Sequence, residues 1–170
     1  SSAHGGALWS WNAGDGFWMT ASNWLPSSVP GVDVFQSYNI HIGDLPGVQN
    51  STVLLNHPVG SGALTFDALA ISDGMTLDMN GREIGGLTGE VTVSGTGSTL
   101  IVRSSLGLNF HDFTAAEMTV GSGALFQFAD NGRARTFTLT NAGVLSGQGT
   151  LHIEGGGPGA AFVNNGMVLR

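Results

Sequence analysis

Gly74-Met-Thr-Leu-Asp-Met79, Gly97-Ser-Thr-Leu-Ile-Val102 and Gly123-Ala-Leu-Phe-Gln-Phe128 are three versions of one pattern. In each version, apolar residues occupy the third and fifth positions after the glycine. These two positions face the same side of a strand, because side chains alternate between its two faces. The glycines recur at intervals of about 25 residues, and each interval contains two further short apolar runs. Three strands per repeat are typical of one coil of a parallel β-helix.

Stacked coils would place equivalent side chains above one another. A single coil cannot bury its own apolar face, whereas stacked coils pair their backbones about 4.8 Å apart. We therefore expect two inward columns, formed by Leu77, Leu100 and Phe126 and by Met79, Val102 and Phe128. Asn and Gly tolerate positive φ, so the Asn-Gly pairs are expected at corners. These pairs are Asn80-Gly81, Asn131-Gly132 and Asn165-Gly166.

Composition limits the classes of protein to which the chain can belong. Among its 170 residues, 41% are hydrophobic and only 10% are charged, which argues against a disordered chain. The net charge of −7 disfavours nucleic acid and anionic membrane surfaces as partners. No apolar run approaches the length of a membrane span, so we expect no membrane insertion. Cysteine is absent, and a fold of this composition must be stabilised without disulfides.

The N-terminal segment differs from the rest because it contains all four tryptophans. Two short apolar runs flank Asn12-Ala-Gly-Asp-Gly16, which predicts a hairpin loop. The tryptophans could form an aromatic platform that binds sugars, or a cap that covers the open edge of the first coil. We favour the cap because the ends of solenoids need covering, and we expect Trp18 and Trp24 to be mostly buried. The predicted organisation is a Trp-rich cap or assembly segment over residues 1–46 and a β-helix over residues 47–170.

Two parts of the chain resemble bacterial surface proteins. The opening order is Trp18, Asn23-Trp24, Pro30-Gly31-Val-Asp33 and Ile40-His-Ile42. The tail repeats a strand–Asn–x–Gly–strand form in Leu139-Thr-Asn-Ala-Gly143-Val-Leu145 and Phe162-Val-Asn-Asn-Gly166-Met-Val168. Both parts are similar to the autotransporter-type and anchor-sorted β-helix repeat proteins of bacterial surfaces. The resemblance implies a β-helix fold, export from the cell and a passive or adhesive role.

The region after Gly47 has room for about five coils of three strands each. The fifth begins at Gly149 and continues through Ala161-Phe-Val163 and Met167-Val-Leu169, with no closing helix, charged loop or proline. We expect bare strands at this edge, with N–H and C=O groups that can pair with another chain. The predicted assembly interface combines the two ends of the stack. It consists of Leu8, Trp9, Trp11, Trp18, Trp24, Phe162, Val163, Met167, Val168 and Leu169.

Few residues have the spacing of a metal site or a hydrolytic pair. Asp67, Asp73 and Asp78 could meet at a corner and bind calcium, but solvated turn aspartates fit their spacing better. The histidines are scattered, with no close pair at ligand spacing. Asp112 and Glu117 could be a pair of glycosidase carboxylates, but an acidic loop is the favoured interpretation. We expect no catalytic residue, no metal and no cofactor.

Two further groups of side chains have weak functional interpretations. Arg133 and Arg135 could form a basic patch, but we expect them to pair with Asp130 and similar neighbours. Thr92, Thr119 and Thr138 could form an outward ladder, which raises the idea of an ice-binding surface. The Thr-x-Thr pair recurs only at Thr138 and Thr140, so that pattern is short.

These observations predict an all-β chain that forms a right-handed parallel β-helix with an N-terminal Trp-rich cap. The expected function is structural, as a secreted subunit of an extracellular fibre or biofilm matrix. Copies of the chain would stack head to tail into a homopolymer. The alternative is a carbohydrate-binding or adhesin module that binds a cell-surface glycan through the N-terminal tryptophans. An enzyme that acts on polysaccharide is not favoured, because no acid–base or metal set converges in the sequence.

Overall fold

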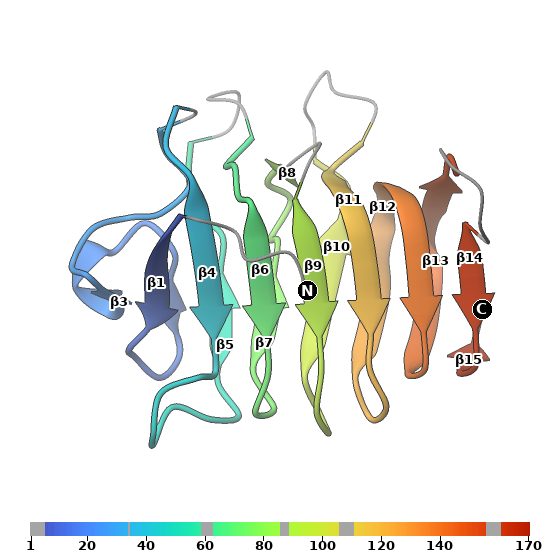
Figure 1. The fold of residues 1–170 in the computed structure, drawn as a ribbon, viewed down its shortest axis with the longest axis horizontal. Coiled ribbons are helices and arrows are strands. Elements are labelled where there is room, and N and C mark those ends of the chain that lie inside the picture. Colours follow the sequence, from blue (N-terminus) through green and yellow to red (C-terminus); the bar gives the residue numbers. More distant parts are fainter. Residues whose placement is uncertain (1–5, 34, 59–62, 86–88, 106–110, 156–160) are drawn as a thin grey trace.

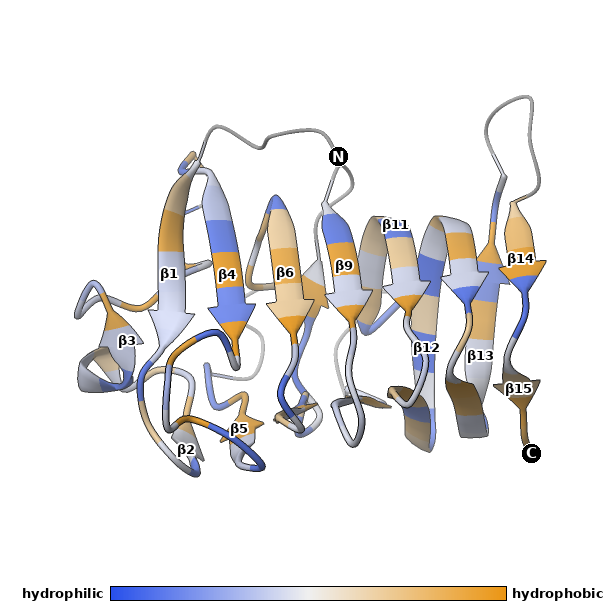
Figure 2. Ribbon diagram, turned by 60° about the horizontal axis from the view of Figure 1, so that its bottom comes forward, coloured by the Kyte–Doolittle hydropathy of each residue, from blue (hydrophilic) through white to orange (hydrophobic). Residues whose placement is uncertain are grey.

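The computed structural model describes residues 6–33, 35–58, 63–85, 89–105, 111–155 and 161–170. The structure is all-β, with 52% of the chain in strands. The strands form one sheet that curls around a shared apolar core (Figure 1 and Figure 2). They are β1 (Ala7–Trp11), β2 (Gly16–Phe17), β3 (Trp24–Leu25), β4 (Tyr38–Ile42), β5 (Thr52–Leu54), β6 (Ala68–Ile71), β7 (Thr76–Asp78), β8 (Ile84–Gly85), β9 (Glu90–Val93), β10 (Thr99–Arg103), β11 (Phe113–Val120), β12 (Leu125–Asn141), β13 (Val144–Ile153), β14 (Phe162–Asn164) and β15 (Met167–Val168).

The strands line up in two long rows of parallel neighbours. The first row is β1, β4, β6, β9, β11, the end of β12, and β14. The second row is β2, β5, β7, β10, the start of β12, β13 and β15. Strand β12 contributes to both rows because it turns a corner, with a register shift between Phe128 and Gly132 against β13. A shorter third alignment joins β8 to β11 and β12.

The second row contains the apolar column that the sequence predicts. Leu100 lies between Leu77 and Phe126 in register, and all three side chains are fully buried. The column extends in both directions, to Val53 and to Leu145. The predicted strand register is therefore confirmed, since a slip of one residue would have turned these side chains outward. Met79, Val102 and Phe128 are also buried, and Val102 pairs with Phe128.

The first row has apolar columns of its own. One consists of Trp9, Ile40, Leu69, Val91, Met118, Leu139 and Phe162. A second column, two residues further along each strand, also faces inward. It consists of Ile42, Ile71, Val93, Val120, Asn141 and Asn164. The second list changes from aliphatic residues to asparagine in its last two members. This change falls at the two corners that carry an Asn-x-Gly sequence.

The N-terminal segment departs from an all-parallel arrangement. After β2 the chain passes through the 3-10 turn η1 (Ala21–Asn23) and returns as β3, which pairs antiparallel with β1. The sheet is therefore mixed. Residues 1–46 are also not separate from the rest in strand pairing, because β4 joins β6 directly in the first row. The first row thus begins before the predicted start of the coils at Gly47.

The predicted corners are partly confirmed. Asn80 and Gly81 both have positive φ, as expected for an Asn-Gly corner. At the second site, Asp130 and Asn131 have positive φ, one residue earlier than predicted. At the third site neither Asn165 nor Gly166 has positive φ. Gly166 is needed there for another reason, because an added Cβ would overlap the carbonyl oxygen of Gly143.

Candidate functional site

The four tryptophans form the core at the N-terminal end of the sheet. Trp11, Trp18 and Trp24 are fully buried, and Trp9 is nearly so. The rings of Trp11 and Trp18 pack edge-on against Trp24, with centroids 5.0 Å and 4.7 Å away. The Trp24 Nε1–H donates to the Trp18 carbonyl at 2.7 Å. The predicted burial of Trp18 and Trp24 is confirmed, and their rings are enclosed by the same chain rather than presented to a sugar or a neighbour.

The strand edges at this end are largely satisfied from within the chain. Strand β3 covers β1 at Ser10 and Trp11. The outer carbonyl of β2, at Phe17, accepts hydrogen bonds from the Thr20 N–H and from Asn23 Nδ2, each at 3.2 Å. On its other side, β1 pairs with β4 of the same chain. Strands β1, β2 and β3 carry the exposed apolar side chains Leu8, Phe17 and Leu25, respectively.

The C-terminal end of the sheet is open. Strand β14 pairs only with β12, and β15 only with β13, in the described part of the chain. Phe162 and Val168 continue the two inward columns, yet they are 43% and 57% exposed. Their column neighbours Leu139 and Leu145 are buried. The side chains that should be core are therefore uncovered at this edge, and we call it the C-terminal edge.

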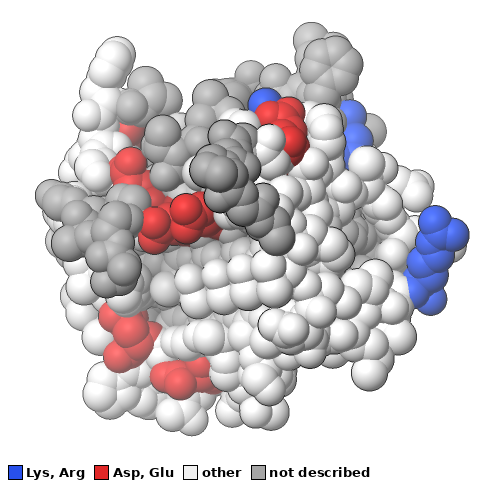
Figure 3. Space-filling view, turned by 45° about the vertical axis from the view of Figure 1, so that its right-hand side comes forward, with Lys and Arg blue, Asp and Glu red and all other residues white. Residues whose placement is uncertain are grey.

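The other residues predicted for this interface point elsewhere. Val163 pairs with Thr140 and Met167 with Val144, which places both side chains on the outer faces of their rows. Leu169 is also exposed, and its N–H donates to the Leu145 carbonyl at 2.8 Å. Of the five residues predicted for this edge, Phe162 and Val168 are the two whose side chains lie in the inward columns. Figure 3, in which this end is turned forward, shows mostly uncharged side chains around it.

The backbone of the C-terminal edge also has free groups. The Asn165 N–H donates to the Asn141 carbonyl, and the Met167 and Leu169 N–H groups donate to β13 and its preceding glycine. Successive amides of a strand point toward its two opposite neighbours. The N–H groups of Phe162, Asn164 and Val168 therefore point away from β12 and β13, toward the open edge. Such a row of outward donors and acceptors is a template for another strand.

Asn141 and Asn164 form a side-chain ladder at one corner of this edge. Asn141 Nδ2 donates to Asn164 Oδ1 at 2.7 Å, across one step of the row. Asn141 Oδ1 accepts the Gly143 N–H at 3.1 Å, and Asn141 is fully buried. In the sequence these two residues indicate turns, and we did not predict from it that their side chains would form a hydrogen bond to each other. The repeat of Asn-x-Gly at the same distance as the coil repeat is the signal that could have revealed it.

Asp112 is the centre of a buried polar cluster. Its side chain is fully buried and accepts hydrogen bonds from the Ser105 N–H at 2.7 Å and from the Arg133 N–H at 2.7 Å. Arg133 Nη2 lies 3.2 Å from Asp112 Oδ1. Burial alone would raise the pKa of Asp112, but hydrogen bonds from Arg133 and Ser105 outweigh it and lower the pKa. Asp112 is thus a structural anion, and Glu117 lies on β11 beyond it, with its side chain exposed.

The basic residues have different partners from those predicted. Arg133 binds Asp112 rather than Asp130, and Arg135 Nη2 binds Glu154 Oε2 at 2.7 Å. Asp130 instead accepts a hydrogen bond from Arg103, which also binds Asp78. The hydrogen bond to Asp78 is the main reason that the pKa of Arg103 is raised. Arg103, Arg133 and Arg135 are each paired with a carboxylate, so Arg133 and Arg135 do not form an unneutralised basic patch.

Two histidines lie close together beside Arg135. The rings of His111 and His152 have centroids 5.9 Å apart, which corrects the expectation of scattered histidines. His152 is exposed, as its position next to the inward Leu151 predicts. Burial lowers the pKa of His111, and the neighbouring charges of Arg135 and His152 lower it further. His111 therefore favours the neutral state near pH 7.

Ser10, His41 and Asp44 also come together, although nothing in the sequence singled them out. Ser10 Oγ donates to Asp44 Oδ2 at 2.8 Å, and His41 Nδ1 lies 3.6 Å from the same oxygen. A catalytic triad requires the histidine between the serine and the carboxylate. Here the carboxylate lies between them and Ser10 is buried, so the arrangement ties β1 to the corner after β4 and does not activate a nucleophile.

The three aspartates considered for calcium have separate roles. Asp67 Oδ2 accepts the Tyr38 N–H at 2.9 Å, Asp78 binds Arg103, and Asp73 occupies a corner with positive φ. Over the described residues, no three His, Asp or Glu side chains lie close enough to hold a metal ion. No helix in the same ranges has the length and hydropathy of a membrane span.

The outward threonines differ from the predicted ladder. Thr119 lies between Thr92 and Thr140, while Thr138 pairs with Glu117 in the adjacent column. A second set, Thr52, Thr76 and Thr99, aligns on the outer face of the second row. Each ladder is three residues long, and the column beside the first contains Glu90 and Glu117. Such short, interrupted arrays offer little flat hydroxyl surface.

Comparisons with known proteins add no relative: no family model matches the chain, and no curated protein or solved structure matches it. The C-terminal edge is the candidate functional site on structural grounds alone. It is the place where the apolar core and the backbone of the sheet are both left open.

Proposed function

We propose that the chain is a structural subunit of an extracellular or cell-surface fibre, built by head-to-tail stacking of β-solenoids through the C-terminal edge. In this proposal the curled sheet is a right-handed parallel β-helix, and each added unit continues its rows. The observation that carries the proposal is the exposure of Phe162 and Val168 at the ends of columns that are otherwise buried. A stacked unit would cover both side chains and pair the outward amides of the last strands.

The N-terminal end supports a particular kind of joint. Strand β1 is covered by β3, and the Phe17 carbonyl of β2 accepts from Thr20 and Asn23, so these strands would not be exchanged between copies. Among the described strands β3 pairs only with β1, which leaves its outer edge for a contact with another copy. The exposed Phe17 and Leu25 supply apolar surface for such a contact. A head-to-tail contact of this type is heterologous and forms an open filament unless its rotation closes a ring.

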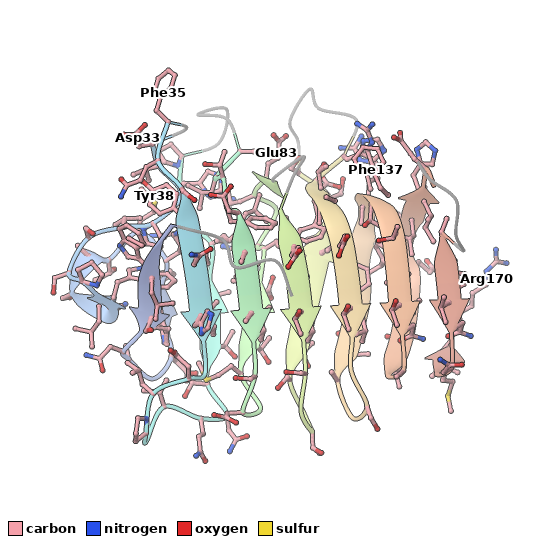
Figure 4. All side chains as sticks on the ribbon, viewed as in Figure 1. Asp33, Phe35, Tyr38, Glu83, Phe137 and Arg170 are labelled. Carbon is pink, nitrogen blue, oxygen red and sulfur yellow. The ribbon has the colours of Figure 1, made fainter. Side chains whose placement is uncertain are left out.

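The glycan-binding alternative has lost the residues on which it was based. A sugar platform needs exposed aromatic faces, and all four tryptophans are in the core. The most exposed aromatic residue among the described residues is Phe35, which projects alone from a turn before β4 (Figure 4). A single projecting ring does not form a platform, so we retain the structural function.

The test is a charge placed on the open end. Phe162→Lys with Val168→Lys puts two cations where a stacked unit would bury them without partners, which costs several kcal/mol. Both positions are about half exposed in the free chain, so the variant should fold. We expect the parent to form larger species with rising concentration in sedimentation velocity and filaments in electron micrographs, and the variant to stay monomeric.

The matched control is Val163→Lys with Met167→Lys. These residues lie on the same two strands and are similarly exposed, but their side chains face outward from the rows. The control should assemble like the parent. A parent that remains monomeric at high concentration, or a Phe162/Val168 variant that assembles as well as the parent, would overturn the proposal.

A further inference from the structure

His111 and His152 bring two imidazole rings together from strands that are not neighbours. His111 lies two residues before β11, and His152 is near the end of β13. Strand β12 is paired between these two strands. The ring centroids are nevertheless 5.9 Å apart, with an angle of 37° between the ring planes. The pair therefore reaches across β12.

Both rings are available as ligands. In the described part of the chain, no hydrogen bond engages either ring. His152 is exposed and His111 is half-buried, so an ion in solvent can reach the pair. Burial lowers the pKa of His111, which favours the neutral ring that metal binding requires.

The separation of the two rings fits a shared metal ion. A zinc–nitrogen bond is about 2.0 Å long, so the centre of a bound imidazole ring lies roughly 3 Å from the ion. Two rings on one ion therefore have centres about 5 to 6 Å apart, and the observed 5.9 Å falls within this range. Imidazole nitrogen is a ligand that suits zinc, copper and nickel, whereas calcium takes oxygen ligands.

Arg135 is the neighbouring charge that a bound cation must tolerate. It lies beside His152 in register, on β12. Its Nη2 binds Glu154 Oε2 at 2.7 Å, and its guanidinium lies over the ring of Phe137, 5.5 Å from the centroid (Figure 4). The carboxylate of Glu154 offsets the charge of Arg135, so the two histidines do not lie beside an unopposed cation.

We infer that His111 and His152 form a binding site for one divalent transition-metal ion of the zinc, copper and nickel class. No group of three His, Asp or Glu side chains in the described ranges can hold a metal, so the two rings are the protein ligands and water completes the coordination. The bound ion ties the start of β11 to the end of β13 across β12. The site is separate from the C-terminal edge and does not depend on stacking.

The test is calorimetric titration of dilute protein with Zn²⁺ alone. Every protein in the series carries His4→Ala, so that the ring of His4 does not contribute. We expect one ion per chain in this parent and a loss of affinity of about tenfold or more in both His111→Ala and His152→Ala, since even changes behind the ligands cost about tenfold. His41→Ala is the matched control. His41 is 40% exposed on β4, beside Asp44, and its removal should leave the affinity unchanged.

Thermal unfolding separates one shared ion from two independent rings. Saturating Zn²⁺ should raise the unfolding temperature of the parent, because the paired rings exist only in the folded chain, and should not raise that of either single variant. His152 is exposed, so His152→Ala should fold and provides the test even if His111→Ala does not. A parent that binds no Zn²⁺ at millimolar concentration, a His152→Ala variant that binds it as tightly as the parent, or an equal loss in His41→Ala would overturn the inference.

Discussion

At the scale of single residues, the core depends on side chains repeated at one level of the stack. Leu100 contacts its column neighbours on both sides and is fully buried, because Leu77 and Phe126 lie directly beside it in register. Ile101 is next in sequence but faces the outer side of the same row and is partly exposed. The two residues therefore provide a matched pair for testing the register.

We predict that Leu100→Ala lowers the free energy of unfolding by about 3 kcal/mol, as expected for a cavity in a packed core. Leu100→Asp should prevent folding, because it buries a carboxylate without a partner. Ile101→Ala should cost clearly less than Leu100→Ala. Urea unfolding followed by far-UV circular dichroism measures all three, and an equal loss for Leu100→Ala and Ile101→Ala would show that the register is wrong.

Asp112 gives the stability of the chain a pH dependence. Its pKa is lower in the folded than in the unfolded state, so its contribution is present above the unfolded pKa of about 3.9 and is lost as pH falls through the folded pKa. Asp112→Asn should reduce stability by about 2 kcal/mol at pH 7, because Arg133 loses its buried partner.

The check is the difference in urea midpoint between parent and Asp112→Asn, measured from pH 7 down to pH 2. The difference should begin to shrink below about pH 4, where Asp112 becomes protonated in the unfolded chain, and should be lost once pH falls below the lowered pKa of the folded state. A difference that stays constant over this range would mean that the charge of Asp112 is not what stabilises the cluster.

At the scale of elements, the corners decide whether successive strands can meet. Gly147 has a φ of 95° and pairs with Phe128 of β12. A Cβ at this position would overlap the carbonyl oxygen of Phe128. Gly14 lies between β1 and β2, which pair with other strands and do not form the predicted hairpin. An added Cβ at Gly14 would lie 3.8 Å from Ser51 Oγ, an ordinary contact, and its φ is not positive, so it has neither constraint.

We predict that Gly147→Ala destabilises the fold by more than about 2 kcal/mol, from backbone strain and the displaced strand together. Gly14→Ala should be nearly neutral. Thermal unfolding of both variants is a sufficient measurement. If Gly147→Ala unfolds at the same temperature as the parent, β12 and β13 cannot lie in the register that we describe.

The elements differ in how far they could be predicted from the sequence. The column through Leu77, Leu100 and Phe126 was predictable because its pattern of glycine and apolar pairs is local and repeated. The return of β3 against β1 was not, because it depends on Trp24 packing onto Trp11 across the end of the sheet. Short polar turns in a sequence do not specify which strand edge the chain will cover.

The candidate site was predictable only in part, for a similar reason. Apolar runs near Phe162 and Val168 identified the open edge, but not which side chains point into the columns, since this depends on pairing with β12 and β13. The partners of Arg133 and Asn141 lie 21 and 23 residues away in sequence, on neighbouring layers. Contacts between layers become visible only after the register of the whole stack is known.

At the scale of the whole molecule, the two ends are unequal. At the N-terminal end β3 lies beside β1 (Figure 1) and the tryptophans fill the core. The C-terminal edge leaves Phe162 and Val168 exposed at the ends of both columns. Among the described residues, no ion pair involves residues 161–170, so assembly at this edge would rest on backbone pairing and apolar contact. We therefore predict that assemblies of the parent persist in high salt, as judged by sedimentation.

Hydrogen exchange at the C-terminal edge tests the central claim most directly. The amides of Phe162, Asn164 and Val168 should exchange rapidly in dilute protein and become protected as the protein assembles, whereas the amides of Leu100 and Phe126 should be protected throughout. The protection should not appear in the Phe162→Lys/Val168→Lys variant. If these three amides are equally exposed in the assembled and dilute protein, or are already protected in the monomer, the C-terminal edge is not the joint.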